Sequence, residues 1–326
     1  MKLFLVLISV LTLTSANAME INGAGASFPY PIYTKWFQEY NKVDKDAKFN
    51  YQAIGSGGGI RQLIKQTVDF GASDAPMKAK DEKKAAWKVH HIPTVIGAVA
   101  VGYNLKDLKG LKLTGEVLAN IYMGKVTKWN DPAITALNKG LKLPNKPILP
   151  VYRADGSGTT AIYTDYLSKV NTAWKSEIGS GKAVQWPAGI GAKGNSGVTG
   201  VIKQRYGSIG YINYSYAVQN KITTVALKNK KGEFVTPSIE STSLAAAKLK
   251  DFSNVKVSIT DSEGSGSYPI SGFTYILLPE NKNEKITKLK EFLKWALTTG
   301  QKYAAELYYA PLPKVLAKKM EVKVTK

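Results

Sequence analysis

The sequence predicts an α/β fold with largely parallel sheets, divided into two domains. Short runs rich in β-forming residues alternate with runs whose apolar residues have helical spacing, as in strands joined by crossover helices. Residues 94–103 form a long apolar run suited to a strand buried on both faces. The 326 residues less a predicted 18-residue leader leave about 308, a length that favours two domains.

The predicted leader is a cleaved signal peptide, residues 1–18. Lys2 gives it a positive start, and residues 3–13 are apolar except for one serine and one threonine. This run is too short to span a bilayer, and Ala16-Asn17-Ala18 fits an A-x-A cleavage site. A buried first strand or an uncleaved anchor is the alternative. We expect cleavage after Ala18.

The first predicted elements of the mature chain lie close together. Residues 49–54 predict a strand, and a glycine cluster follows them. Residues 60–66 carry apolar side chains at helical spacing, and residues 68–72 predict the next strand. The buried strand at 94–103 comes after these three elements.

The second half of the chain repeats the pattern. Residues 148–154 predict a strand that leads through glycine, serine and threonine into a helix at about 160–169. Residues 283–298 predict an amphipathic helix that stops near Gly300. One face of that helix carries Ile286, Leu289, Phe292, Leu293 and Ala296. No fixed-period repeat or low-complexity linker separates the elements, so we expect short strands to join any two lobes.

The composition argues against some classes of function. The net charge is +21, but only three of the 45 basic residues are arginine and the lysines are scattered. That distribution is typical of a solvated lysine surface, and we expect no nucleic-acid partner. The chain has no cysteine, so it can form no disulfide and carry no lipid on a cysteine. Free diffusion in an extracytoplasmic space, most simply a periplasm, is therefore expected.

The segment from Arg153 to Thr160 is the strongest candidate for an anion site. A predicted strand delivers Arg153, whose planar guanidinium can bond two oxygens of an anion at once. Asp155 can hold that guanidinium in one orientation. Ser157, Gly158 and Thr159 then open a helix whose N-terminal N–H groups favour negative charge. An ordinary capped turn is the alternative for this segment alone.

Three other junctions have the same form. They are rich in glycine, alanine or serine. Residues 23–29 lead into a run with apolar side chains at helical spacing, residues 55–59 lie between a predicted strand and helix, and residues 71–76 follow a predicted strand. Any one of them is more often structural than functional. Open α/β sheets, however, bind ligands at the carboxyl ends of their strands, next to helix N-termini. Four such junctions in one chain therefore favour a common binding site.

Asp74 is the unexpected member of this set, because a carboxylate repels an anion. Its presence makes sense if the anion carries a proton. Phosphate keeps at least one proton near neutral pH and can donate it to a carboxylate, whereas sulfate is fully ionised and would face an unpaired, like-charged acceptor. A capping or turn role is the alternative for Asp74.

Other patterns carry less weight. Residues 189–194 fit G-x-G-x-x-G, but no acidic residue lies about 20 positions on in a suitable context, which argues against a dinucleotide site. His90 and His91 are the only histidines. The side chains of two adjacent residues point in different directions, and the chain has no cysteine to serve as a further metal ligand. We therefore expect no metal site.

The junctions together resemble the periplasmic phosphate-binding proteins of bacterial phosphate ABC transporters. The resemblance extends over nearly the whole mature chain. Its segments are Gly-Ala-Gly-Ala-Ser-Phe-Pro at 23–29, Asp-Phe-Gly-Ala-Ser-Asp-Ala-Pro at 69–76, Pro-Thr-Val-Ile-Gly at 93–97, Ile-Tyr-Met-Gly-Lys at 121–125 with Lys128-Trp129, 153–159 and 207–211.

This resemblance implies a type II periplasmic-binding-protein fold, with two α/β lobes, a ligand cleft between them and two hinge crossovers. Lobe I would comprise residues 19–93 and 268–326, and lobe II residues 94–267. The implied phosphate contacts are Ala26, Ser27, Phe28, Ser56, Asp74, Arg153, Ser157, Gly158 and Thr159, with Asp155 orienting Arg153. Ser27 replaces a threonine that is common in the family, and Gly57 replaces a common second serine.

The implied function is that of a receptor, not an enzyme. It would bind inorganic phosphate with high affinity in the periplasm and deliver it, as a monomer without cofactors, to the inner-membrane phosphate ABC permease. Two alternatives remain. A receptor for another tetrahedral oxyanion, such as sulfate or molybdate, has Asp74 against it. A secreted phosphatase would need a metal cluster or an activated nucleophile, which two histidines and no cysteine supply poorly.

Overall fold

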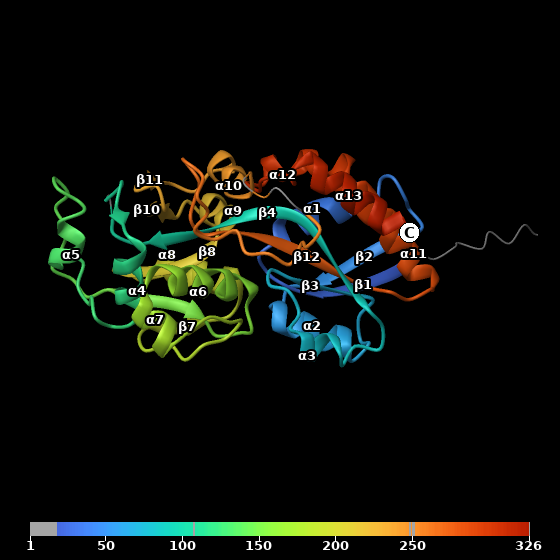
Figure 1. Ribbon diagram of the computed structural model, residues 1–326, viewed down its shortest axis with the longest axis horizontal. Coiled ribbons are helices and arrows are strands. Elements are labelled where there is room, and N and C mark those ends of the chain that lie inside the picture. The colour runs from blue at the N-terminus through green and yellow to red at the C-terminus, as the bar shows by residue number, and fades with distance from the viewer. Residues whose placement is uncertain (1–17, 107, 248, 250–251, 326) are drawn as a thin grey trace, which may run out of the picture.

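The computed structural model describes residues 18–106, 108–247, 249 and 252–325 and has an elongated, two-lobed shape (Figure 1). All but the last residue of the predicted signal peptide lies outside the described residues. Within the described ranges, no helix has both the length and the apolar character that crossing a bilayer requires.

The described strands form one large sheet and one small one. They are β1 (Met19–Gly25), β2 (Ala47–Gln52), β3 (Phe70–Ser73), β4 (Val89–Tyr103), β5 (Lys112–Leu113), β6 (Leu149–Arg153), β7 (Ile190–Ala192), β8 (Ser208–Asn213), β9 (Thr223–Thr224), β10 (Ala226–Lys228), β11 (Phe234–Val235) and β12 (Ser271–Pro279).

Helices cover both faces of the large sheet. They are α1 (Tyr30–Tyr40), α2 (Ser56–Ile64), α3 (Ala79–Glu82), α4 (Gly115–Tyr122), α5 (Pro132–Thr135), α6 (Gly158–Val170), α7 (Thr172–Glu177), α8 (Gly194–Gln204), α9 (Tyr214–Gln219), α10 (Ile239–Ala246), α11 (Glu284–Leu297), α12 (Lys302–Glu306) and α13 (Lys314–Thr325), with a 3-10 turn at Thr299–Gln301.

The strand order of the large sheet explains how two lobes share it. The order is β2-β1-β3-β12-β4-β8-β6-β7, with β9 also paired to β4. Residues 89–98 of β4 pair with β12, and residues 99–103 pair with β8. We call the part with β2, β1, β3 and β12 lobe I, and the part with β8, β6 and β7 lobe II. Strand β4 thus crosses between the lobes (Figure 1).

The prediction of largely parallel sheets holds only for part of the structure. Strand β1 is parallel to β2 and β3, and β6 is parallel to β7 and β8. Strands β4 and β12 are antiparallel to each other, and β4 is antiparallel to β8. A chain that crosses into lobe II on one strand and returns beside it on another must reverse direction, so the middle of the sheet is mixed.

The predicted elements are present with shifted ends. Strands β2, β3 and β6 match the predictions at 49–54, 68–72 and 148–154 to within two or three residues, and α6 and α11 match theirs within two. The buried strand begins five residues earlier than predicted, at Val89. Residues 89–93 were missed because two histidines and a proline interrupt the apolar run there.

The glycine cluster at 55–59 was wrongly placed between a strand and a helix. Helix α2 already begins at Ser56, so three glycines form its first turn. Their small size is needed because this turn packs directly on β1. A Cβ atom at Gly59 would lie 2.5 Å from the Cα of Gly25, which is closer than packed atoms approach. The close packing outweighs the low helix propensity of glycine.

Candidate functional site

The predicted junctions meet where lobe I faces lobe II. Residues 26–28 follow β1, Ser56 begins α2, and Asp74 follows β3, all in lobe I. Arg153 ends β6 and residues 157–159 begin α6, both in lobe II. The side chains are buried, with no more than 4 % exposed at Ala26, Ser27, Phe28, Ser56, Asp74, Arg153, Ser157 and Thr159. We call these eight residues and Gly158 the inner site.

Arg153 is held by Asp155, as predicted from the sequence. The Nε and Nη2 atoms of Arg153 donate to the two carboxylate oxygens of Asp155 at 2.7 and 2.6 Å, and Nη1 donates to the Thr159 hydroxyl at 3.2 Å. Burial raises the pKa of Asp155, but the hydrogen bonds and charge of Arg153 outweigh it and leave this pKa below its ordinary value. Asp155 is therefore a fixed anionic support for the guanidinium.

The arginine retains two donors for a ligand. A guanidinium has five N–H groups, and three of them are used by Asp155 and Thr159. The remaining two are one on each terminal nitrogen. They form the parallel pair that bonds two oxygens of one anion.

Ser56 joins the two lobes. Its hydroxyl accepts a hydrogen bond from the N–H of Gly158 at 3.0 Å and another from the N–H of Asp74 at 3.2 Å. The N–H of Gly57 also donates across the gap, to the Gly156 carbonyl at 2.7 Å. The first turns of α2 and α6 thus touch, and the described conformation is closed at this point.

Three hydroxyls of the inner site share one arrangement. Ser27 accepts from the N–H and the side-chain amide of Asn195 at 3.0 and 2.9 Å. Thr159 accepts from Arg153 and from the Asn195 amide, each at 3.2 Å, and Ser56 accepts the two N–H groups described above. A hydroxyl that accepts twice keeps one hydrogen to donate. All three can therefore donate to an anion placed between them.

Asn195 was not predicted from the sequence. It lies in the first turn of α8, is fully buried, and connects Ser27 of lobe I with Thr159 of lobe II. The side-chain Oδ1 of Asn195 accepts a hydrogen bond from the N–H of Asn213 at 2.8 Å, which fixes the orientation of the side-chain amide. The only sequence signal was the glycine-rich run 189–194, whose last N–H donates to Asp155 at 3.0 Å. That run resembles a dinucleotide-binding motif, and its sequence does not indicate that Asn195 contacts the anion site.

The three residues after β1 contribute unequally. The N–H of Ala26 donates to the Ala72 carbonyl at 3.0 Å and is therefore occupied. The carbonyls of Ala26, Ser27 and Phe28 accept the hydroxyls of Tyr51, Tyr216 and Tyr309 at 2.7, 2.7 and 2.6 Å. These tyrosines fix the loop, and no hydrogen-bond acceptor among the described residues takes the N–H of Phe28.

The start of α6 is capped from within. The Ser157 hydroxyl accepts the N–H of Thr160 at 3.0 Å. The Thr160 hydroxyl is 2.6 Å from the Tyr211 hydroxyl, to which the Arg153 N–H donates at 3.0 Å. This network ties the arginine strand to the helix that begins the anion cradle.

Asp74 has one oxygen engaged and one free. The Thr274 hydroxyl donates to Oδ1 at 2.8 Å, while Oδ2 is buried without a hydrogen-bond partner among the described residues. Burial raises the pKa of Asp74 to about 7, against the lowering effects of the Thr274 hydrogen bond and the Arg153 charge. A buried acceptor without a partner costs about 1–3 kcal/mol, and a ligand that donates a proton to it would remove that cost.

The two histidines do not join the site. His90 contacts Glu280 at 3.0 Å, and the Nε2 of His91 accepts the N–H of Met77 at 2.9 Å. Searched through its described ranges, the chain has no group of three or more histidine and acidic side chains placed to hold a metal ion.

Comparison with known proteins identifies the family of this chain. A family model described as a PBP superfamily domain matches residues 12–299. The phosphate-binding protein PstS of Pasteurella multocida is 47% identical over 325 residues, covering 98% of this chain and 93% of its own. The protein of the same name from Haemophilus influenzae is 47% identical over 308 residues, covering 93% and 91%.

Solved structures share the fold at lower identity. A high affinity periplasmic phosphate-binding protein (PfluDING) bound with phosphate has a TM-score of 0.73 at 18% identity and covers 93% of each chain. The phosphate-binding protein from Stenotrophomonas maltophilia has a TM-score of 0.69 at 18% identity and covers 94% of each chain. These likenesses confirm the predicted type II periplasmic-binding-protein fold, and the sequence relatives show that the chain belongs to the phosphate-binding protein family of bacterial phosphate ABC transporters.

Proposed function

We propose that this protein is a non-catalytic receptor that binds inorganic phosphate at the inner site and delivers it to an ABC-type import permease. The observation that carries the proposal is the pairing of Arg153 with Asp74. A fork of two free N–H groups lies on one side, and a buried carboxylate oxygen without a partner belongs to the other. Phosphate can satisfy both, because it accepts on its charged oxygens and donates its proton.

The proposed contacts follow from the donors that remain free. Arg153 gives two N–H groups, and Ser27, Ser56 and Thr159 each give one hydroxyl hydrogen. The N–H of Phe28, the Ser157 hydroxyl and the N–H of Thr159 complete the cradle. The N–H groups of Gly158 and Thr160 are already taken by the Ser56 and Ser157 hydroxyls. In this arrangement Ala26 positions the loop through its backbone instead of donating to the anion, since its N–H is occupied by Ala72.

Release and capture require the lobes to separate. The contacts between Ser56 and Gly158, and between Ser27 and Asn195, cross from one lobe to the other, so opening breaks them and exposes the inner site. We place lobe I at residues 19–93 and 268–326 and lobe II at 94–267, with β4 and β12 as the strands about which the lobes move. The same proposal has the protein act as a monomer in the periplasm.

A thermal-unfolding series with three anions tests the function. Phosphate at a hundred times its dissociation constant stabilises the folded state by about 2.7 kcal/mol. We expect the melting temperature to rise by about 5 °C or more with phosphate. Sulfate and molybdate at the same ionic strength should leave it nearly unchanged at about pH 9, where Asp74 is charged.

Two results would contradict the proposal. Stabilisation by sulfate but not by phosphate would assign the protein to another oxyanion. Release of inorganic phosphate from p-nitrophenyl phosphate, at a rate that follows protein concentration through purification, would show a phosphatase.

Gly158→Ala should prevent closure without unfolding either lobe. A Cβ atom at position 158 would overlap the Ser56 hydroxyl oxygen and lie 2.6 Å from Oδ2 of Asp74. These atoms belong to the opposite lobe, so the clash exists only when the lobes are closed. We expect phosphate affinity to fall at least about tenfold, which is 1.4 kcal/mol, with an unchanged melting temperature in the absence of phosphate.

Gly200→Ala is the matched control, because a Cβ at position 200 of α8 would meet no atom within 4 Å. Phosphate affinity should stay the same in this variant. Equal affinity of Gly158→Ala and Gly200→Ala in calorimetry would mean that the described closed contact is not the binding conformation.

A further inference from the structure

A second groove lies between the lobes, next to the inner site. It has a volume of about 300 Å³ and is lined by α6, by residues 180–182 and 256–260, and by Asp74 with the residues that follow it. Asp74 therefore belongs to both spaces. Its free oxygen lies near Gly158 of the inner site, and the residue also lines the groove. We call this space the outer groove.

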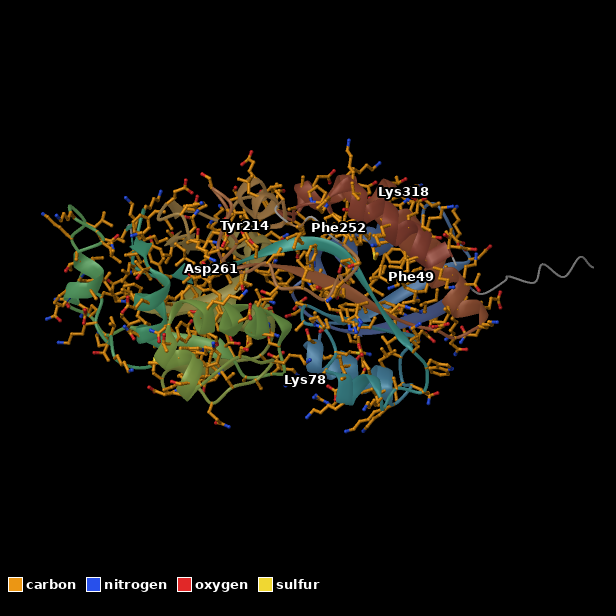
Figure 2. The ribbon with its side chains drawn as sticks, viewed as in Figure 1. Phe49, Lys78, Tyr214, Phe252, Asp261 and Lys318 are labelled. Carbon is orange, nitrogen blue, oxygen red and sulfur yellow. The ribbon has the colours of Figure 1, made fainter. Side chains whose placement is uncertain are left out.

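Three lysines line the outer groove from three different segments. Lys78 precedes α3 in lobe I, Lys182 lies in the loop between α7 and β7 of lobe II, and Lys256 lies in the segment before β12. Figure 2 shows Lys78 on the side of lobe I that faces lobe II. Positive charge thus approaches the groove from both lobes.

The acidic groups nearby leave two of these lysines without a counterion. Lys256 pairs with Glu82. Asp165, the other carboxylate in the groove, accepts from the hydroxyls of Ser258 and Thr260 and pairs with Lys169 at 3.1 Å. In the described part of the chain, neither Lys78 nor Lys182 has an ion-pair partner.

The environment of Lys182 is unfavourable for its own charge. Burial lowers its pKa. The charge of Asp81 opposes this shift, and the smaller effect of the Lys78 charge adds to it. Burial therefore disfavours the charge of Lys182, and an anion bound beside it would offset that penalty. The carbonyl of Lys182 also accepts the N–H of Ser157 at 2.8 Å, so this residue is directly connected to the helix start in the inner site.

We propose that the outer groove is a capture site for phosphate-class oxyanions, whose lysines attract the anion while the lobes are apart, before it passes Asp74 into the inner site and the lobes close. The proposal rests on phosphate binding at the inner site as proposed above. Apart from Asp74, which it shares with the inner site, the groove's one lining carboxylate is Asp165, which already has partners. The lysines therefore attract anions by charge and do not distinguish phosphate from sulfate. Capture by charge and selection by Asp74 are then separate steps.

A different inter-lobe groove provides a matched control. It is lined by Lys35 of α1 and Lys203 of α8 and likewise has residues from both lobes. There, Lys35 is neutralised by Glu39 at 2.9 Å. Removing Lys35 and Lys203 changes the net charge as much as removing Lys78 and Lys182, without touching the outer groove.

Stopped-flow mixing with inorganic phosphate, followed by tryptophan fluorescence, tests the proposal. In Lys78→Gln/Lys182→Gln the association rate constant should fall about threefold or more at low ionic strength, with an unchanged dissociation rate constant. The difference should vanish near 1 M salt, where the screening length is about 3 Å. Lys35→Gln/Lys203→Gln should associate at the wild-type rate.

Competition by sulfate distinguishes anion binding at the outer groove from general electrostatic attraction to the lysine-rich surface. In the wild-type protein it should slow phosphate association more than chloride does at equal ionic strength, and this excess should be lost in Lys78→Gln/Lys182→Gln. Equal slowing in both double variants, or no excess effect of sulfate, would overturn the capture site while leaving the receptor function intact. Failure of the wild-type protein to bind phosphate would instead overturn the receptor function itself.

Discussion

Arg153→Ala should weaken phosphate binding by about 2 kcal/mol or more, a loss of roughly 30-fold. The substitution removes two charge-assisted N–H donors from a buried site. It also leaves Asp155 and the Thr159 hydroxyl without the donors that now orient them. The loss therefore combines a missing contact, an uncompensated carboxylate beside an anion, and a less ordered cradle.

Isothermal titration calorimetry with phosphate measures this loss of affinity. Two control variants show whether the loss comes from the guanidinium of Arg153. Arg205→Ala removes an exposed arginine at the end of α8 and should bind like the wild-type protein. Arg153→Lys keeps the charge without the planar fork, so its affinity should fall between the other two. Wild-type affinity in Arg153→Ala would show that the inner site is not where phosphate binds.

The convergence of the inner site could be predicted because it follows from fold topology. Residues that end β1, β3 and β6 or begin α2 and α6 lie at one edge of parallel strands, and local sequence identifies them as strand-to-helix junctions. The partnership of Arg153 with Asp155 is also local, because only one residue lies between them. These features depend on short stretches of chain.

The remaining features depend on contacts between distant segments. Asn195 reaches Ser27 across 168 positions, and Thr274 donates to Asp74 across 200. No local pattern marks either residue. Thr274 lies at an irregularity in the pairing of β12 with β4, between Thr274 and Tyr275. The partner that leaves Asp74 with one engaged and one free oxygen is therefore set by the tertiary fold.

At about pH 9, where Asp74 is charged, Asp74→Asn should reduce the preference for phosphate over sulfate by about 100-fold or more. In the wild-type protein, sulfate cannot donate to the free oxygen of Asp74 and meets a like charge. An asparagine removes the charge and adds an N–H donor that sulfate accepts. Phosphate should lose affinity at the same time, because its proton then faces a neutral amide instead of a carboxylate.

Paired calorimetric titrations with phosphate and sulfate give the selectivity of each protein. Thr274→Val is the control, because it removes the donor to Oδ1 of Asp74 and keeps the carboxylate. It should retain a strong preference for phosphate. If Asp74→Asn kept the wild-type ratio of affinities, selection would have to come from elsewhere in the inner site.

The raised pKa of Asp74 should make the affinity for sulfate depend on pH. At a pH below the Asp74 pKa of about 7, the carboxyl group is neutral and can donate a hydrogen bond. At a higher pH the group is charged and repels sulfate. Sulfate binding therefore requires Asp74 to take up one proton. Its affinity should rise about tenfold for each unit as pH falls from about 9 to 7, and then level off.

Asp74→Asn should abolish this dependence, since no proton is taken up. Phosphate brings its own proton to the carboxylate, so the wild-type preference for phosphate should be greatest in alkaline solution and decline toward neutral pH. A sulfate affinity that is flat across this range in the wild-type protein would mean that Asp74 does not face the anion.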